Sequence, residues 1–218
     1  MTKTKTFISI IPFQGKDMLK AVTYPPHGNS RLQYGETRFP IIPVINGYAQ
    51  EGDAIRIIVI LTDGENFQHN YNTYFVPEVE ALVEKKNLQL TGFEIIRTPD
   101  REDIDTQLRL FRDINDKIRD NEELYACITY GTKPTPIIES MALNYAVQNK
   151  TNTTVGCIVY GRYFHDDINC NNGIYDTTAL FRMDRIVNEL AKKKVKNPER
   201  AIRLMLDFAL EQDGDDNE

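Results

Sequence analysis

The sequence has no long apolar run. No stretch approaches the roughly 18 consecutive apolar residues of a membrane-spanning helix, and the apolar part of the N-terminal MTKTKTFISIIPF is too short for a signal peptide. An excess of basic residues is also missing. The formal net charge is −6, whereas proteins that coat nucleic acids need a broad basic surface. We therefore predict a soluble, cytoplasmic protein that binds neither a membrane nor long nucleic acids.

Cysteines are few, and catalytic motifs with a fixed spacing are absent. The cysteines lack the spacing of a metal site, and Cys127 and Cys157 lie in apparent strands, where buried, reduced thiols are expected. The P-loop motif, a G-x-G-x-x-G after the first predicted strand and the G-x-S-x-G of serine hydrolases are all missing. His165, Asp166 and Asp167 are adjacent, but no matching ligand pair is visible, which favours a hydrated loop. We predict no metal and no cofactor.

The pattern of apolar residues predicts an α/β fold. Hydrophobic residues make up 41% of the 218 residues, enough for a sizeable core. Runs rich in β-branched residues alternate with segments of helical spacing, and the runs are apolar nearly throughout, which indicates a mostly parallel sheet with helices on both faces. The predicted strands are 6–11, 55–61, 92–97, 124–130, 154–160 and 174–176, and the predicted helices are 39–49, 74–86, 104–119, 137–148, 179–193 and 198–210.

These elements predict a single Rossmann-like domain over residues 1–210, which ends in two C-terminal helices. The last eight letters, EQDGDDNE, are acidic, and we expect residues 211–218 to form a disordered tail.

Three predicted strands end in polar loops. Ligands of open α/β sheets bind beyond the carboxyl ends of the strands, where helix N-termini present free N–H groups. The loops read PFQGK (12–16), TDGENFQHNYN (62–72) and TYGTKPTP (129–136). In the third loop Gly131 permits close approach to the backbone, and Lys133 adds a positive charge beside a helix start. We predict a pocket for a ligand with phosphate and aromatic groups, although TYGTKPTP alone also fits an ordinary turn.

The predicted ligand-binding residues come mostly from these loops. Tyr24, Tyr34 and Tyr74 are further candidates for stacking on an aromatic ligand, or else ordinary packing residues. The ligand-binding prediction comprises Pro12, Phe13, Gln14, Gly15, Arg38, Thr62, Asp63, Asn66, Thr129, Tyr130, Gly131, Thr132, Lys133 and Thr135.

One segment resembles a known family. CITYGTKPTPIIESMALNYAVQNKTNTTVGCIVYGRYF is similar to the signature of CRISPR-associated Rossmann-fold (CARF) domains, in the branch with an Asp-x-Thr-His-Gly motif. Thr129, Gly131 and Lys133 match in order, followed by ALNY and VYG, while Cys127 and Tyr130 stand where the family has aspartate and histidine. YGETRFP and IYDTTALFRMDRIVNELAK resemble further elements of these domains.

The resemblance implies a homodimer that binds a cyclic oligoadenylate, a tetra- or hexa-adenylate, which is the second messenger of type III CRISPR antiviral defence. A ring with an even number of adenylates has two-fold symmetry and fits across the axis of a dimer. Family members usually carry an effector domain, and none is visible in this sequence. We therefore expect a standalone sensor that acts by itself or through a separate effector protein.

Acting by itself would mean ring nuclease activity without a metal. The 2′-hydroxyl of the ligand would attack the adjacent phosphorus and leave a 2′,3′-cyclic phosphate, which needs alignment and charge stabilisation from the protein. The predicted catalytic residues are Lys133 for the phosphoryl charge, Thr132 as its assistant and Gln14 to orient the 2′-hydroxyl. Two alternatives remain: a sensor, sponge or regulator that does not cleave its ligand, and a Rossmann-like enzyme acting on a mononucleotide.

Overall fold

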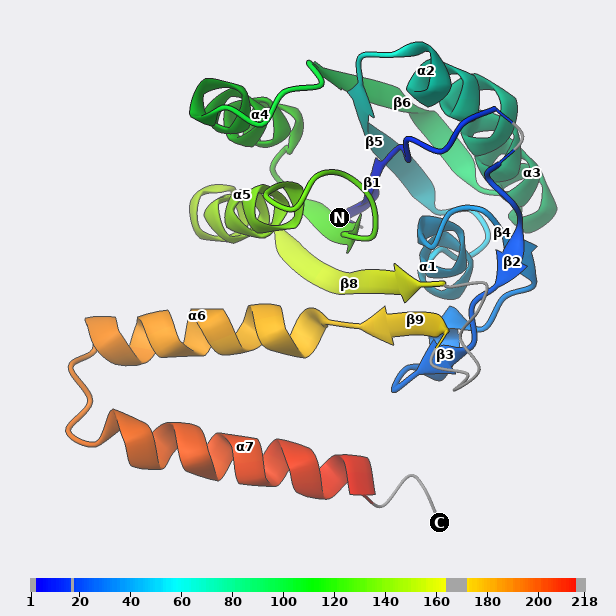
Figure 1. Ribbon diagram of the computed structural model, residues 1–218. Helices are drawn as coiled ribbons and strands as arrows, with labels where there is room; N and C mark the ends of the chain where they lie inside the picture. The colour runs from blue at the N-terminus through cyan, green and yellow to red at the C-terminus, as the bar shows by residue number, and fades with distance from the viewer. Residues whose placement is uncertain (1–2, 17, 164–171, 215–218) are drawn as a thin grey trace. The chain divides into compact units, whose positions relative to one another are not determined.

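A seven-stranded sheet organises the N-terminal part of the computed structural model, which describes residues 3–16, 18–163 and 172–214 (Figure 1). Its strands are β1 (Thr4–Ile10), β3 (Pro26–His27), β5 (Ala54–Thr62), β6 (Gln89–Thr98), β7 (Glu122–Cys127), β8 (Thr154–Arg162) and β9 (Gly173–Asp176). The strand order is β3-β9-β8-β7-β1-β5-β6, and every pairing is parallel except that between β8 and β9. A separate antiparallel pair joins β2 (Val22–Thr23) to β4 (Glu36–Thr37). The predicted, mostly parallel Rossmann-like fold is confirmed.

Helices cover both faces of this sheet. One face carries α1 (Ile41–Tyr48), α2 (Glu65–Asn70) and α3 (Val76–Lys86), and the other carries α4 (Ile104–Lys117) and α5 (Thr135–Asn149) (Figure 1). Side chains alternate along a strand, so Phe7 and Ile11 join the large buried cluster under α1 to α3, while Ile8 and Ile10 face α4 and α5. Both faces thus contribute to the core, as a parallel sheet requires.

The structure adds a helical segment to the predicted elements and shortens one predicted strand. Residues 62–72, read as a polar loop from the sequence, contain α2 and the start of a π-helical segment that continues into α3. The reason is that Phe67, Tyr71 and Phe75 recur every four residues and are all buried. Strand β7 ends at Cys127 rather than at residue 130, because the Thr129 hydroxyl accepts the Gly161 N–H (2.8 Å) where a backbone carbonyl would continue the ladder.

The last described residues form a helical hairpin. The chain divides into two compact units, Met1–Thr177 and Thr178–Glu218. The second unit contains α6 (Thr178–Lys192) and α7 (Pro198–Gly214), which contact one another. They correspond to the two predicted C-terminal helices. Helix α7 runs on to Gly214, beyond its predicted end at residue 210, and residues 215–218 lie outside the described part.

Candidate functional site

The connections of β1 and β7 create a crevice at the carboxyl end of the sheet. These strands are neighbours. The chain from β1 passes through β2, β3, β4 and α1 before it enters β5 on one side of β1, whereas β7 leads through α5 to β8 on the other side. The strand order therefore reverses between β1 and β7, and such switch points are where open α/β sheets bind ligands. The loops that follow the two strands are residues 12–14 and 129–132, which the sequence had singled out.

A pocket of about 510 Å³ occupies this crevice, which is within the size range of small-molecule sites. We call it the first pocket. Its lining residues are Pro12, Phe13, Gln14, Thr62, Phe67, Asp100, Thr129, Tyr130, Gly131 and Thr132. All of them except Phe67 and Asp100 belong to the predicted ligand-binding set. The structure therefore brings together predicted residues from three separate loops.

An aromatic pair forms one wall of the first pocket. Phe13 is 65% exposed, and its ring centroid lies 5.4 Å from that of Phe67 on α2, with the rings tilted by 54°. An exposed ring held against a buried one is a preorganised surface on which a flat ligand can stack. The sequence analysis missed Phe67 because residues 62–72 were read as a loop, although its four-residue spacing from Tyr71 and Phe75 was the available signal.

Asn70 holds the loop that carries Phe13. Its side chain is fully buried, and its Nδ2 donates to the carbonyls of Pro12 (3.0 Å) and Gln14 (2.9 Å). Two hydrogen bonds from one rigid amide fix the path of this loop along α2. The side-chain amide of Gln14 is exposed and makes no hydrogen bond with any residue that the structure describes. It is free to contact a ligand.

The loop after β7 is a tight turn built around Gly131. The φ angle of Gly131 is +98°, and a Cβ at this position would lie 3.0 Å from Cβ of Thr135. The Thr135 N–H donates to the Thr132 carbonyl (3.0 Å), and the two threonine hydroxyls are 3.1 Å apart. Glycine is therefore required twice, for its backbone angle and for the space that Thr135 occupies. The predicted role of Thr135 is indirect, since it is buried behind Thr132.

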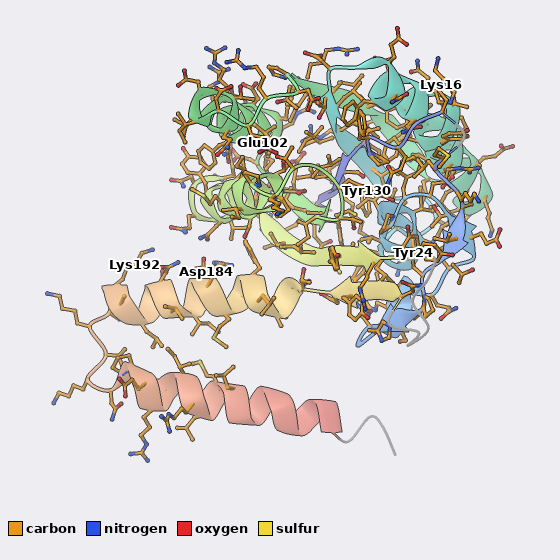
Figure 2. The ribbon with its side chains drawn as sticks, viewed as in Figure 1. Lys16, Tyr24, Glu102, Tyr130, Asp184 and Lys192 are labelled. Atoms are coloured by element: carbon orange, nitrogen blue, oxygen red, sulfur yellow. The ribbon has the colours of Figure 1, made fainter. Side chains whose placement is uncertain are left out.

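Tyr130 supports the pocket wall. Its hydroxyl donates to the Arg38 carbonyl (2.8 Å) and interacts with that of Tyr24 (both tyrosines are labelled in Figure 2). Burial raises the pKa of Tyr130 well above its usual value and the pKa of Tyr24 to about 12. Burial also raises the pKa of Cys127 to about 12, so its thiol stays protonated and is no nucleophile. These three groups are neutral scaffolding.

A second pocket, of about 440 Å³, adjoins the first. Its lining residues are Gln14, Met18, Leu19, Lys20, Val22, Tyr24, Thr129, Tyr130, Tyr160, Gly161, Arg162 and Tyr163. Gln14, Thr129 and Tyr130 line both pockets and so form the wall between them. Tyr24, one of the predicted stacking candidates, is mostly buried, whereas Tyr160 and Tyr163 are 37% and 39% exposed.

Other predicted residues line neither pocket. These are Gly15, Arg38, Asp63, Asn66, Lys133 and Thr135. The Arg38 guanidinium instead contacts Glu78 (2.9 Å) and the Leu19 carbonyl (2.9 Å) and lies 4.3 Å from the Tyr74 ring, so Arg38 and Tyr74 engage each other. Lys133 is exposed at the start of α5. Its predicted role, like that of Tyr34, stays a prediction.

The described residues contain no group of three His, Cys, Asp or Glu side chains that could hold a metal ion. His165, Asp166 and Asp167, with Cys170, lie outside the described residues. No helix in the described ranges has the length and apolar character needed to cross a membrane. No protein-family model matches the chain, and no curated protein is detectably similar to it in sequence.

Proposed function

We propose that the protein binds a cyclic oligoadenylate at the carboxyl end of its sheet, as a two-fold dimer, and cleaves it without a metal. The main support is the first pocket, which unites the loops after β1 and β7 at the switch point of the sheet. The resemblance to CARF domains rests on the second of these loops. The pocket supplies both an aromatic surface and polar groups, as recognition of a nucleobase needs.

Adenine suits the chemistry of the first pocket. The exposed Phe13 ring offers a stacking surface, and among the described residues Asp100 is the only charged one that lines the pocket. A carboxylate accepts hydrogen bonds and cannot donate them, so it would pair with the exocyclic amine of adenine. Phosphate groups would lie towards the start of α5, where Lys133 is exposed.

An apolar stripe on α4 and α5 supports the dimer. Ile104 and Leu108 on α4 and Ile137, Met141 and Tyr145 on α5 are between 46% and 64% exposed and recur at four-residue spacing. Exposed apolar side chains gathered in this way mark interaction surfaces. Ile137 follows the Gly131 loop closely in sequence, so a two-fold contact through this stripe would bring two ligand pockets near one axis.

The cleavage step would use the ligand's own nucleophile. The 2′-hydroxyl attacks the adjacent phosphorus, the P–O5′ bond breaks, and the products carry a 2′,3′-cyclic phosphate and a 5′-hydroxyl, which receives the proton. The free amide of Gln14 would orient the 2′-hydroxyl, and Lys133 with Thr132 would stabilise the charge that develops on the phosphoryl oxygens. This assignment makes no use of Cys127 and Cys157, whose thiols are buried.

The test is incubation with cyclic tetra- and hexa-adenylate, followed by equilibrium binding and chromatography of the products. Binding with a 2′,3′-cyclic phosphate product is expected, together with a mass by light scattering of about twice 25.1 kDa. Binding without cleavage would leave a sensor or sponge. Failure to bind either ring would refute the proposal and favour an enzyme of mononucleotides.

A glycine pair sharpens this test. Gly131→Val combines a backbone angle that L-residues rarely adopt with a clash against Thr135, so it should deform the loop and weaken ring binding about tenfold or more. Gly35→Val is the matched control, because a Cβ at Gly35 meets no atom within 4 Å. Equal binding by the two variants would mean that the loop after β7 does not contact the ligand.

A further inference from the structure

The sequence at the two ends of α7 carries opposite charge. Residues 192–203, which form the turn after α6 and the first part of α7, contain six lysines and arginines and one glutamate. Every residue from 192 to 200 is exposed. The last twelve residues, 207–218, contain six acidic residues and no basic one. We call 192–203 the basic turn and 207–218 the acidic end. One helix therefore separates the two strongest charge clusters of the second unit.

This distribution is unfavourable for a single helix. The carboxyl end of a helix carries a partial negative charge, which basic residues offset and acidic residues reinforce. The last turn of α6 holds Lys192 (labelled in Figure 2), whereas the last turn of α7 holds no basic residue. The acidic end of α7 would therefore be stabilised by cations that come from another element.

The lysines of the basic turn in the same chain are too distant for this role. Helix α7 has 17 residues, and a helix rises about 1.5 Å per residue, so its two ends lie about 25 Å apart. The four residues after Gly214 can extend by at most about 14 Å. At physiological ionic strength, charges in water are screened beyond about 8 Å. The matching cations must therefore come from elsewhere than the turn that precedes the same helix.

Three apolar residues lie between the two charged ends. Leu204, Met205 and Leu206, near the middle of α7, are 60%, 42% and 41% exposed. Successive residues of a helix are about 100° apart, so these side chains spread over about 200° of its circumference. Helix α6 contacts α7 but leaves all three exposed (Figure 1). Exposed apolar residues flanked by charged ones are typical of protein interfaces.

A second copy of α7 in the antiparallel direction would complement each of these features. We infer that α7 pairs with α7 of a second copy across a two-fold axis near Leu206. The apolar residues of both helices then meet at the centre, and the acidic end of each copy lies beside the basic turn of the other, so the same contact is made twice. With this axis, Arg200 lies level with residues 211–213 of the other copy. The pairing needs no ligand, so it stands apart from the proposed function.

The first experiment locates the axis. Leu206→Cys is made in a Cys170→Ser background, in which the two remaining native cysteines are buried. A short bis-maleimide should link two copies through residue 206, because the axes of packed helices lie about 8–10 Å apart. Val187→Cys, at a residue of α6 that is 42% exposed, is the matched control and should cross-link about tenfold more slowly or less. Equal rates for the two positions would mean random collision and would overturn the pairing.

The second experiment exchanges the charges. A turn variant and an end variant are both made in the Leu206→Cys chain. The turn variant carries Lys193→Glu, Lys194→Glu and Lys196→Glu, and the end variant carries Asp213→Lys, Asp215→Lys and Asp216→Lys. Alone, each variant loses the attraction at both contacts and should cross-link about tenfold more slowly than the parent chain. In an equal mixture, the unaltered turn of one variant meets the unaltered end of the other, and cross-linking should be at least about threefold faster than for either alone.

Recovery on mixing is a result that misfolded chains would not give. If the mixture stays as slow as the separate variants, the acidic end meets some other part of the chain and the pairing is refuted. If both variants cross-link as fast as the parent, charge does not direct the contact and the pairing is refuted as well. Binding of a single-stranded RNA is measured in parallel. A turn variant that loses this binding but still cross-links like the parent would make the basic turn a nucleic-acid site instead.

Discussion

The two faces of the sheet are constructed differently. The face under α1 to α3 is closed by aromatic contacts, with ring centroids 5.0 Å apart for Phe39 and Phe75 and 4.8 Å apart for Phe7 and Tyr125. The face under α4 and α5 contains buried charge instead. Arg56, on β5, is almost fully buried and pairs with two carboxylates. The same layer holds Glu139, a buried side chain of α5 with no hydrogen-bond partner among the described residues.

The two faces therefore differ in how they affect the stability of a monomer. The face under α1 to α3 stabilises it, and the face under α4 and α5 contains groups that lower its stability. Aromatic packing stabilises the fold directly. A buried carboxyl without a partner and an exposed apolar stripe on the same helix do not help a monomer. Helix α5 also begins at the loop that lines the first pocket. We infer that the α4 and α5 face gives up stability where binding and association are expected.

The largest predicted effect tests the buried charge on that face. Arg56→Ala should lower the free energy of unfolding by about 3–5 kcal/mol, because the Glu122 carboxylate would stay buried without its counter-charge. Urea denaturation at a fixed protein concentration measures the loss. Arg112→Ala, which breaks the exposed pair with Asp113 (2.7 Å), is the control and should cost about 0–1 kcal/mol. Similar costs for both variants would mean that the Arg56 network contributes no more than a surface pair.

Glu139 gives the second prediction. Burial raises the pKa of its carboxyl well above the usual value. The folded state therefore keeps a proton that the unfolded chain releases above its ordinary pKa of about 4.3. Its contribution to stability falls as pH rises from there to the raised pKa. Glu139→Met removes the polar group and should raise the free energy of unfolding by about 1–3 kcal/mol at neutral pH.

The pH dependence distinguishes this cause from better packing. The difference in unfolding free energy between Glu139→Met and the wild type should be smaller near pH 4 than near pH 7, since most of the unfolded wild type is also protonated at the lower pH. Urea denaturation of both proteins at the two pH values measures this difference in the free energy of unfolding. Glu84→Gln, at an exposed position of α3, is the control and should show no comparable gap. A constant gap for Glu139→Met would show that the carboxyl group does not titrate in this way.

The sequence was sufficient to predict those parts of the site that follow from the order of strands and loops along the chain. The apolar strands imply a parallel sheet, and a parallel sheet brings the loops after β1, β5 and β7 to one edge, so residues such as Gln14, Thr62 and Thr129 could be grouped in advance. Gly131 was identified for its backbone freedom, which its φ of +98° uses. These predictions need no knowledge of which side chains meet.

The sequence could not predict how distant side chains engage each other. Arg38 was assigned to the ligand, yet its guanidinium contacts Glu78, a residue of α3 that no local pattern links to it. The second pocket likewise combines Lys20 and Tyr24 with Tyr160, which come from opposite ends of the unit. Such contacts depend on the packing of whole elements, and that packing is set by the complete core.

The smallest predicted effect concerns the apolar stripe. Met141→Lys introduces a charge that would be desolvated in a contact through α5, so it should weaken self-association about tenfold, or about 1.4 kcal/mol. The stability of the monomer should change by no more than about 0.5 kcal/mol, because Met141 is exposed there. Ala81→Lys, at an exposed position of α3 on the opposite face, is the matched control. Light scattering across a concentration series measures both variants. If they associate equally, the stripe is ordinary exposed surface, and the two faces of the sheet differ only in their buried polar groups.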